Sequence, residues 1–460
     1  MSGRSILRPS LALLASAALL AGCAAGPDYA PPGAVPALAP AYLTDYRPPV
    51  GGTDVWWEGF GDPELNAAVE RALAGNLTLS AARDRLAAAR AAVLAERSDR
   101  RPALDLQGGL EASGDTGGGS VLGGTGSGGV LFNPDLNGRL SREIAAAAAR
   151  ARASDYVVAD TRRLVAATVA QQVIEIRRSE ARLALLEEST DLQERTLRIV
   201  ELRFEAGLSA NLDVRRAAAD LAQTEAQRGV LLLQRAQAVR ALSVLLGETP
   251  QPLPEVADKP VIPRFAGGAP TGIPADLLRR RPDILVAEAN LAEAAALVGA
   301  EQADLLPALA LSGTLSAGDR LAAGLIGDVF GAIGVILDVP ILDGGRRRAE
   351  IAAARAEADA RFREYQQTVL EALRDVENAL VAIASYSDRS ARLRDAIRQS
   401  EAAFVQSNAL YREGLTSLFD VLDAQRQLIG SRQSLIDSDA AIAASVIDLY
   451  AAIGAPTDRI

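Results

Sequence analysis

The stretch FEAGLSANLDV at 204–214 recurs downstream as YREGLTSLFDV at 411–421. The shift is 207 residues, so that Gly207 matches Gly414. A second pair of related stretches lies upstream of these. It begins at Pro102 and at Pro307, where the shift is 205 residues. The chain therefore contains one unit of about 200 residues twice, which is far longer than the period of a solenoid. We expect two similar repeats, and the architecture of one repeat decides the fold.

The composition of the 460 residues favours long helices and excludes several kinds of site. The chain is 49% hydrophobic but only 4% aromatic, which suits helices packed side by side. Its net charge is −10, and no long basic block favours nucleic-acid binding. Histidine is absent and there is one cysteine, which excludes Ser–His and Cys–His catalysis, Cys/His zinc sites and disulfides within the chain. We expect neither an enzyme nor a metal site.

The N-terminus has the pattern of a bacterial lipoprotein signal. Two arginines precede an apolar run at 11–20, which has the length of a signal-peptide core and is too short to span a bilayer. The sequence LAGC at 20–23 follows, and it contains the only cysteine. We interpret 1–22 as a lipoprotein signal peptide and Cys23 as a lipidated residue carrying N-palmitoyl and S-diacylglycerol. Residues 23–55 are then a lipidated tether. The alternative is an ordinary secretory signal with a coincidental cysteine.

Within each repeat, the spacing of apolar residues changes from helical to alternating and back. Directly after Pro102 and Pro307, leucines alternate with polar or small residues, which predicts a strand with one apolar face. These leucines are Leu104, Leu106 and Leu110 in the first repeat, and Leu309, Leu311 and Leu315 in the second. We divide the chain into a first repeat at 56–250 (helix, β-hairpin about 102–139, long helical hairpin about 141–247), an inter-repeat linker at 251–274, and a second repeat at 275–460 (helix, β-hairpin about 307–340, long helical hairpin about 345–454).

The predicted hairpins have the length and alternation of outer-membrane strands. Four strands from one chain cannot close a barrel, and an open sheet in lipid leaves its edges without partners. Either the hairpins lie in water, or several chains share one barrel. The helical stretches beside them, each about 66 residues and roughly 100 Å long, favour a shared barrel. Pro134 and Pro340 lie near the ends of the second strands, where each removes a hydrogen-bond donor, so we expect the first of these strands to bend or end early.

Four stretches resemble the outer-membrane efflux proteins, the TolC-like exit ducts, and within them the lipidated RND-type, NodT-like branch. They are WWEGFGDPELNAAVERALAGNLTL at 56–79, RRPDILVAEANLAEAAALVGAEQADLLPALALSG at 280–313, LDGGRRRAEI at 342–351 and YREGLTSLFDVLDAQR at 411–426. The resemblance implies a mainly α protein with a small β part. Long helical hairpins would form a periplasmic α-barrel, and three chains would share a transmembrane β-barrel with four strands from each chain.

The resemblance also implies partners and a location. The partners are two further copies in a homotrimer, a periplasmic adaptor (membrane fusion protein), an inner-membrane RND-type transporter and outer-membrane lipid. The location is the outer membrane of a Gram-negative bacterium, and the function is a passive exit duct for small toxic compounds or drugs. A duct for type I polypeptide secretion or metal-ion efflux is the alternative within the fold. Outside the family, the alternative is a lipid-tethered coiled-coil scaffold without a pore.

By resemblance, the turns between the long helices form the tip where the adaptor docks. The residues are Gly207, Leu208 and Ser209 in the first repeat, and Gly414, Leu415 and Thr416 in the second. Glycine suits such turns because it accepts a positive φ. The alternative is a plain helical turn without a docking role. Asp213 and Asp420 lie just past the turns, and we expect both to cap the returning helices.

The resemblance places a pore gate on the helix after the second turn. Asp423 would form a ring of carboxylates that attracts cations, and Phe419, one helical turn earlier, would constrict the pore. Tyr411 and Arg426 would hold this tip to neighbouring helices. The first repeat has Arg216 where the second has Asp423, so we expect the gate in the second repeat. For Asp423 the alternative is a solvated helix carboxylate, and for Tyr411 and Arg426 it is an ordinary structural contact.

Overall fold

The computed structural model describes Ala30 and residues 41–43, 55–114, 120–266, 280–320 and 329–454. The predicted signal peptide at 1–22 and Cys23 lie outside the described residues. The chain forms two units, and both repeats contribute to each. Of the described residues, the sheet unit holds those within Asp84–Tyr156 and Leu285–Gln367, and the helical unit holds those within Pro36–Arg83, Val157–Ile284 and Thr368–Ile460.

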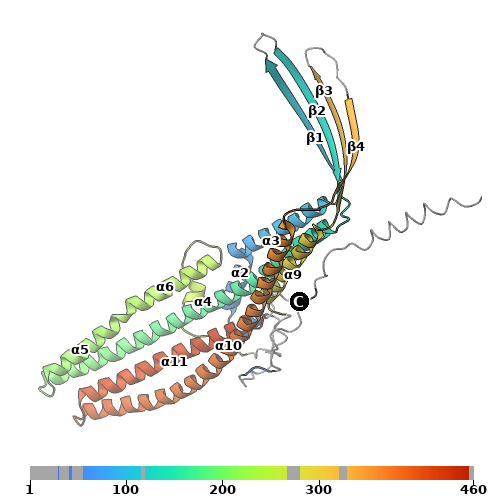
Figure 1. The fold of residues 1–460 in the computed structure, drawn as a ribbon. Helices are drawn as coiled ribbons and strands as arrows, with labels where there is room; N and C mark the ends of the chain where they lie inside the picture. Colours follow the sequence, from blue (N-terminus) through green and yellow to red (C-terminus); the bar gives the residue numbers. More distant parts are fainter. Residues whose placement is uncertain are drawn as a thin grey trace, which may run out of the picture. The chain divides into compact units, whose positions relative to one another are not determined.

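The sheet unit contains one antiparallel sheet of four strands in the order β1-β2-β3-β4 (Figure 1). The strands are β1 (Ala103–Gly114), β2 (Ser120–Phe132), β3 (Ala308–Arg320) and β4 (Val329–Asp338). The prediction of four strands per chain is thus confirmed. The second strand of each hairpin ends two residues before a proline, at Phe132 before Pro134 and at Asp338 before Pro340, because proline cannot donate to the ladder.

The strand register gives the sheet one apolar face and one mixed face. Leu104 pairs with Val130, Val130 with Gly313, and Gly313 with Ile333. The same face also holds Leu106, Leu110, Leu309, Leu311, Leu315 and Val335, whereas the other face is mixed and holds Asp105, Gln107, Ser312 and Thr314 together with Leu131, Phe330 and Ile336. No strand residue whose burial is described is buried, and Ile333 is 95% exposed. Protein atoms of this chain therefore leave the apolar face uncovered.

Each hairpin lies between a short helix and a very long one. The short helices, α3 (Leu77–Ser98) and α9 (Pro282–Ala303), have 22 residues each, and the long helices, α4 (Arg139–Glu205) and α10 (Arg346–Arg412), have 67 each. The short pair is related by a shift of 205 at both ends and the long pair by a shift of 207. The structural repeat therefore follows the sequence repeat residue by residue in these helices. Within the described residues, no helix carries a stretch long and apolar enough to cross a membrane.

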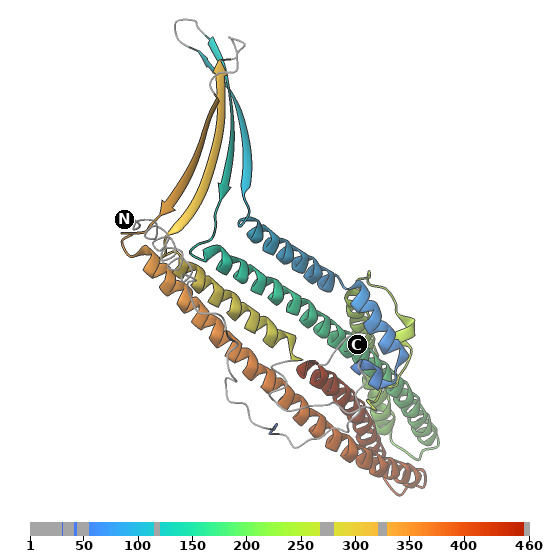
Figure 2. The same cartoon turned by 90° about the vertical axis from the view of Figure 1, so that its right-hand side faces the viewer.

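In the helical unit, α4 and α10 each turn back into a returning helix (Figure 2). The second repeat returns in one helix, α11 (Leu418–Ala452), whereas the first returns in two, α5 (Asn211–Glu225) and α6 (Gln227–Leu245). The residue types on one row of these helices also differ between the repeats. At the 207 shift, Arg228 and Arg235 of the first repeat replace Leu435 and Ile442 of α11. Charged side chains on this row prevent a continuous apolar seam.

An aromatic cluster holds the short helix at 56–60 in the helical unit. Trp56, in a short 3-10 helix (η1, Trp56–Phe60), stacks on Tyr450 of α11 with ring centroids 5.7 Å apart. Phe265 contacts Tyr450 from the linker at 5.2 Å. The next helix, α2 (Pro63–Gly75), is capped by Asp62, which accepts from two backbone N–H groups. A short helix, α7 (Pro254–Ala257), follows α6 in the linker.

Candidate functional site

The two tip turns have the same geometry, and both depend on glycine. Gly207 and Gly414 have φ of 73° and 76°, the left-handed region that other residues rarely adopt. The next residue closes each turn, since Leu208 N–H donates to Arg203 O at 2.8 Å and Leu415 N–H donates to Leu410 O at 2.9 Å. Leu208 is 66% exposed and Leu415 is 74% exposed. Each turn therefore displays a leucine at its end.

The residues after the leucines make different contacts in the two turns. Ser209 Oγ donates to Val200 O at 3.3 Å, back onto α4. Thr416 Oγ1 instead donates to Asp420 Oδ2 at 2.6 Å, forward onto α11. Hydrogen bonds from Thr416 and Ser417 hold the pKa of the exposed Asp420 carboxyl below its ordinary value.

Only one of the two predicted caps is present. Ser417 and Asp420 form a reciprocal capping box at the start of α11, so the prediction for Asp420 is confirmed. At the start of α5 the cap position is Ala210, and no side chain caps the helix. The prediction for Asp213 is therefore wrong, because alanine has replaced the hydroxyl residue that completes the box. Asp213 instead lies 3.9 Å from Arg216.

Phe419 and Asp423 lie four residues apart on an exposed face of α11. Phe419 is 56% exposed, and the side chain of Asp423 is 53% exposed. The opposite face of α11 packs into an apolar cluster through Leu418, Val421, Leu422 and Leu428. The two predicted gate residues are thus presented outward by a helix that is anchored on its other side.

Tyr411 joins α10 to α4 at the tip. Its side chain is 5% exposed, and the guanidinium carbon of Arg203 lies 4.8 Å from the centroid of its ring. Arg203 Nη1 also donates to Arg412 O at 2.9 Å, so one arginine of α4 holds the end of α10 twice. Burial raises the pKa of the Tyr411 hydroxyl above its ordinary value despite the nearby guanidinium.

Arg426 joins α11 to α5. It lies between Asp220 at 3.9 Å and Asp423 at 4.0 Å. Gln193 Nε2 on α4 donates to Asp220 Oδ2 at 2.9 Å. Burial raises the pKa of Asp220, against the opposing effect of Arg426. Both residues predicted as a latch therefore contact a neighbouring helix. Tyr411 of α10 contacts α4, and Arg426 of α11 contacts α5.

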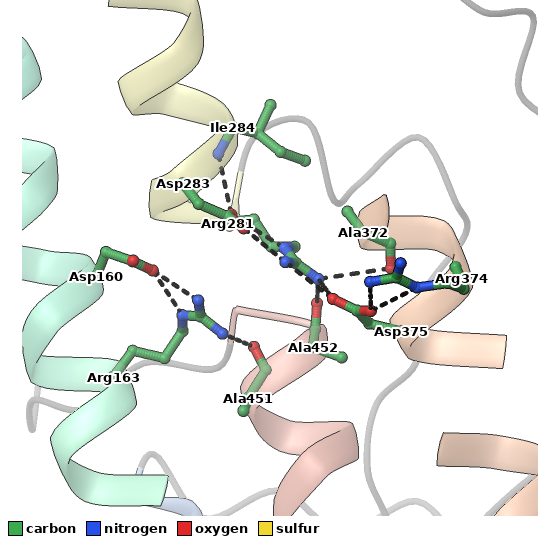
Figure 3. Close-up of polar contacts among 10 residues, drawn as sticks. All are labelled: Asp160, Arg163, Arg281, Asp283, Ile284, Ala372, Arg374, Asp375, Ala451 and Ala452. Atoms are coloured by element: carbon green, nitrogen blue, oxygen red, sulfur yellow. Dashed lines mark hydrogen bonds and ion pairs between the residues drawn. The ribbon is translucent and has the colours of Figure 1, made fainter. Parts of the chain in front are cut away.

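A second polar centre lies at the other end of α11, and the sequence reasoning assigned it no role (Figure 3). Arg281, 4% exposed, donates through Nη1 to Ala452 O at 3.1 Å and through Nη2 to Asp283 Oδ2 at 2.5 Å. Arg163 on α4 donates through Nη1 to Ala451 O at 2.6 Å. Two guanidinium groups thus bind the last carbonyls of α11, where the helix dipole is negative. The only signal of this centre in the sequence is the arginine run before Pro282. That run contributes to the family resemblance but does not by itself predict a buried arginine.

Comparisons with known proteins match most of this chain. The model of the family described as outer membrane efflux protein matches residues 68–248 and 273–455. The chain belongs to the outer membrane efflux protein family. Nodulation protein T of Rhizobium leguminosarum bv. trifolii is 31% identical over 438 residues, 91% of each chain. The pyoverdine export outer membrane protein OpmQ of Pseudomonas aeruginosa is 29% identical, over 97% of this chain and 96% of that protein. The solved outer-membrane channel OprN matches with a TM-score of 0.85 and 29% identity, covering 94% of this chain and 99% of that one.

Membership fixes the class of function. An outer membrane efflux protein is a transport duct rather than an enzyme, and its place is the outer membrane of a Gram-negative bacterium. The uncovered apolar face of the four strands suits that place, because lipid covers such a face. The fold predicted from the sequence, mainly helical with a small β part, is confirmed.

Proposed function

We propose that three copies of this efflux protein assemble into one duct. The carrying observation is the sheet, which has β1 and β4 as edges and an apolar face that its own chain leaves uncovered. Unpaired strand edges are not tolerated in lipid, so each β1 edge must pair with the β4 edge of another copy. Three sheets closed in this way give a barrel, and the long helical hairpins continue it as a tunnel in the periplasm.

The tip turns are the docking surface for a periplasmic adaptor. Leu208 and Leu415 are held outward by rigid glycine turns, which suits a partner with small apolar pockets. The adaptor connects the duct to an RND-type transporter in the inner membrane, which supplies the energy. The duct itself is passive, and its cargo is small toxic compounds or drugs. The pyoverdine export relative supports a cargo of small molecules rather than polypeptides.

The gate lies on α11. In the trimer, Asp423 and Phe419 of three chains face one another across the entrance, and the carboxylates bind cations while the rings narrow the opening. Two contacts hold the entrance closed, Arg203 with Tyr411 and Arg426 with Asp220. Both link the second helical hairpin to the first, so movement of one hairpin against the other breaks them.

Planar-bilayer recording of the purified full chain tests this function. We expect small resting conductance, because the tip contacts close the entrance, and large conductance for Arg203→Met combined with Arg426→Gln. Native mass spectrometry of the same samples reports the oligomer. A monomer, or a trimer without conductance even when both contacts are removed, contradicts the duct and favours the scaffold without a pore.

Lipidation of Cys23 anchors the N-terminus of each chain in the membrane. The support is the signal-like sequence before the only cysteine of the chain. Cells grown with labelled palmitate are expected to label the natural chain and not Cys23→Ser. Labelling of Cys23→Ser contradicts the assignment. The three acyl chains of such an anchor add to the hold of the strands on the membrane.

A further inference from the structure

A cluster of three charged residues fixes the start of α4 in the sheet unit. Arg139 Nε lies 3.0 Å from Glu143 Oε1 on the same helix and 3.4 Å from Asp304 Oδ1, directly after α9. Asp304 belongs to the second repeat, whereas Arg139 and Glu143 belong to the first. The cluster is therefore a contact between the two repeats.

The second repeat contains two members of an equivalent cluster. Because α4 and α10 are related by a shift of 207 at both ends, Arg139 corresponds to Arg346 and Glu143 to Glu350. Arg346 Nη1 lies 3.2 Å from Glu350 Oε1, so this pair is formed again at the start of α10. The side chain of Arg346 is nevertheless 66% exposed. Within the described residues, no carboxylate takes beside Arg346 the place that Asp304 takes beside Arg139.

The third member is Asp99. Because α3 and α9 are related by a shift of 205 at both ends, Asp304 corresponds to Asp99, directly after α3. Asp99 is exposed, and in the described part of the chain it forms no ion pair. It precedes β1, whereas Arg346 follows β4, and these strands are opposite edges of the sheet. The two residues therefore belong to opposite edges of one chain.

A second contact between the repeats shows the same correspondence. Gly299 of α9 lies against Arg142 of α4, so close that a Cβ at Gly299 would be 3.0 Å from Arg142 Cδ. The corresponding residues are Leu94 of α3 and Ala349 of α10, so the small residue is now on the long helix and the large one on the short helix. Leu94 is 65% exposed, and Ala349 is exposed as well. The two exposed surfaces are complementary in size.

We propose that Asp99 of one chain completes the cluster of Arg346 and Glu350 of the next chain, with Leu94 packed over Ala349 beside it. This inference rests on the proposed trimer and names the residues of its seam. The seam between chains then repeats the seam between the repeats within a chain. We expect the charged contacts of this seam only at the first turns of the long helices. The next in-chain ion pair is Arg150 with Glu293, and the corresponding residues, Glu357 and Ala88, cannot form an ion pair.

Crosslinking between differently tagged chains tests the seam. Full-length Asp99→Cys carrying a large tag and Arg346→Cys carrying a small tag are co-expressed, purified as oligomers and treated with a short bismaleimide. We expect an adduct that carries both tags as the main product. The matched control is one chain with Arg139→Cys and Asp304→Cys, which is expected to link within itself. Asp99→Cys co-expressed with Glu413→Cys is expected to give background only.

The outcomes separate the seam from the duct. Trimers that yield no two-tag adduct, while the in-chain control links, overturn the seam and leave the proposed function intact. A link within a single chain carrying both Asp99→Cys and Arg346→Cys also overturns it. If native mass spectrometry shows that the natural chain forms no trimer, that result contradicts the proposed function instead. Charge reversal gives a second readout: Asp99→Arg is expected to lower the trimer fraction at least tenfold, and Asp99→Arg with Arg346→Asp to restore it, whereas Arg348→Asp leaves it unchanged.

Discussion

Arg281 shows how a single buried side chain organises one end of the helical unit. It binds a carbonyl of α11, the carboxylate of Asp283 and, at 3.4 Å, the carboxylate of Asp375 on α10. A buried guanidinium is tolerated only when its donors and its charge are satisfied. Removing one partner therefore costs more than an exposed ion pair contributes.

The pH dependence of stability follows from Asp283. Burial alone raises the pKa of this carboxyl, but the hydrogen bond and charge of Arg281 outweigh burial, and the net pKa lies below the ordinary value of 3.8. A carboxyl with a lowered folded-state pKa stabilises the fold above its ordinary pKa and loses that contribution as the pH falls through the folded-state value. Asp283→Asn is expected to lower the free energy of unfolding at pH 7 by about 2 kcal/mol, and the difference is expected to shrink as the pH falls through the folded-state pKa, which lies below 3.8. Thermal unfolding at a series of pH values from 7 downward measures it, and a difference that grows as the pH falls contradicts the sign. Asp388→Asn, in an exposed pair, is the control.

The charge of Asp423 is tested by cation block. If three carboxylates face one another in the duct, Asp423→Ala is expected to weaken block by a trivalent cation at least tenfold, because close like charges bind a cation together. Single-channel recording with added cation measures it. Glu413→Ala, near the same tip but outside α11, is expected to block like the natural chain. Equal block in both variants indicates a solvated carboxylate.

At the scale of elements, the two helical hairpins have the same length but different internal construction. α11 is one helix with a capping box, whereas the first repeat has no side-chain cap at Ala210 and divides into α5 and α6 at Ala226, where the backbone stays in the right-handed helical region. The proposed gate is therefore carried by the hairpin whose returning helix is capped and continuous.

The tip glycines and the helix glycines are expected to respond oppositely to alanine. At Gly414 the left-handed φ of 76° disfavours a side chain, so Gly414→Ala is expected to lower stability by about 1 kcal/mol. Gly430 lies inside α11, and no other part of the chain lies within 4 Å of the place where a Cβ would stand, so Gly430→Ala is expected to raise stability by about 1 kcal/mol. Thermal unfolding of both variants measures this. Strong destabilisation by Gly430→Ala indicates another chain packed closely against α11.

The contact between α4 and α10 is expected to depend on the ring of Tyr411. Tyr411→Leu removes the cation–π contact with Arg203, which contributes about 1 kcal/mol, and is expected to raise the open fraction several-fold in bilayer recordings. Tyr411→Phe keeps the ring and is expected to behave like the natural chain. Equal conductance of the natural and leucine variants contradicts the latch.

Local signals in the sequence predicted the elements that depend on local chemistry. Pro134 and Pro340 marked the strand ends, alternating leucines marked the strands, and Gly207 and Gly414 marked the turns. The division between α5 and α6 at Ala226 is not predicted by the sequence, because the backbone stays helical there and no proline marks it. The role of Arg281 was missed because its acceptor, Ala452, lies 171 residues away, and a buried charge cannot be recognised until its partners are known. The expected cap at Asp213 is wrong because a capping box also needs a hydroxyl residue three positions earlier, and that position is Ala210.

At the scale of the whole molecule, the repeat sets equal lengths for the two hairpins. The long helices have 67 residues each, so each tip turn follows a helix of the same length. A docking partner that binds both tip turns at once requires long helices of equal length.

Deleting one heptad, about 7 residues, from both α10 and α11 shortens the second hairpin by roughly 10 Å. We expect such a variant to form trimers and conduct, but to lose adaptor-dependent drug resistance in cells. The same deletion made in both hairpins restores equal lengths and is expected to recover part of the resistance. Resistance and bilayer conductance are measured in parallel. Full resistance with unequal hairpins contradicts joint docking of the tips.

The pairing of β2 with β3 has a consequence for how the chain is made. Phe132 pairs with Leu311, so the central strands come from different repeats and the sheet cannot form until the second repeat has been synthesised. Pairing between segments so distant in sequence is also slow, whereas each helical hairpin closes locally. The lipid-facing surface is therefore completed only after the second repeat has been made, and a chain that stops after the first repeat carries only the β1–β2 hairpin. The four-stranded apolar face is thus a late product of folding, whereas each helical hairpin can form as soon as its own repeat is complete.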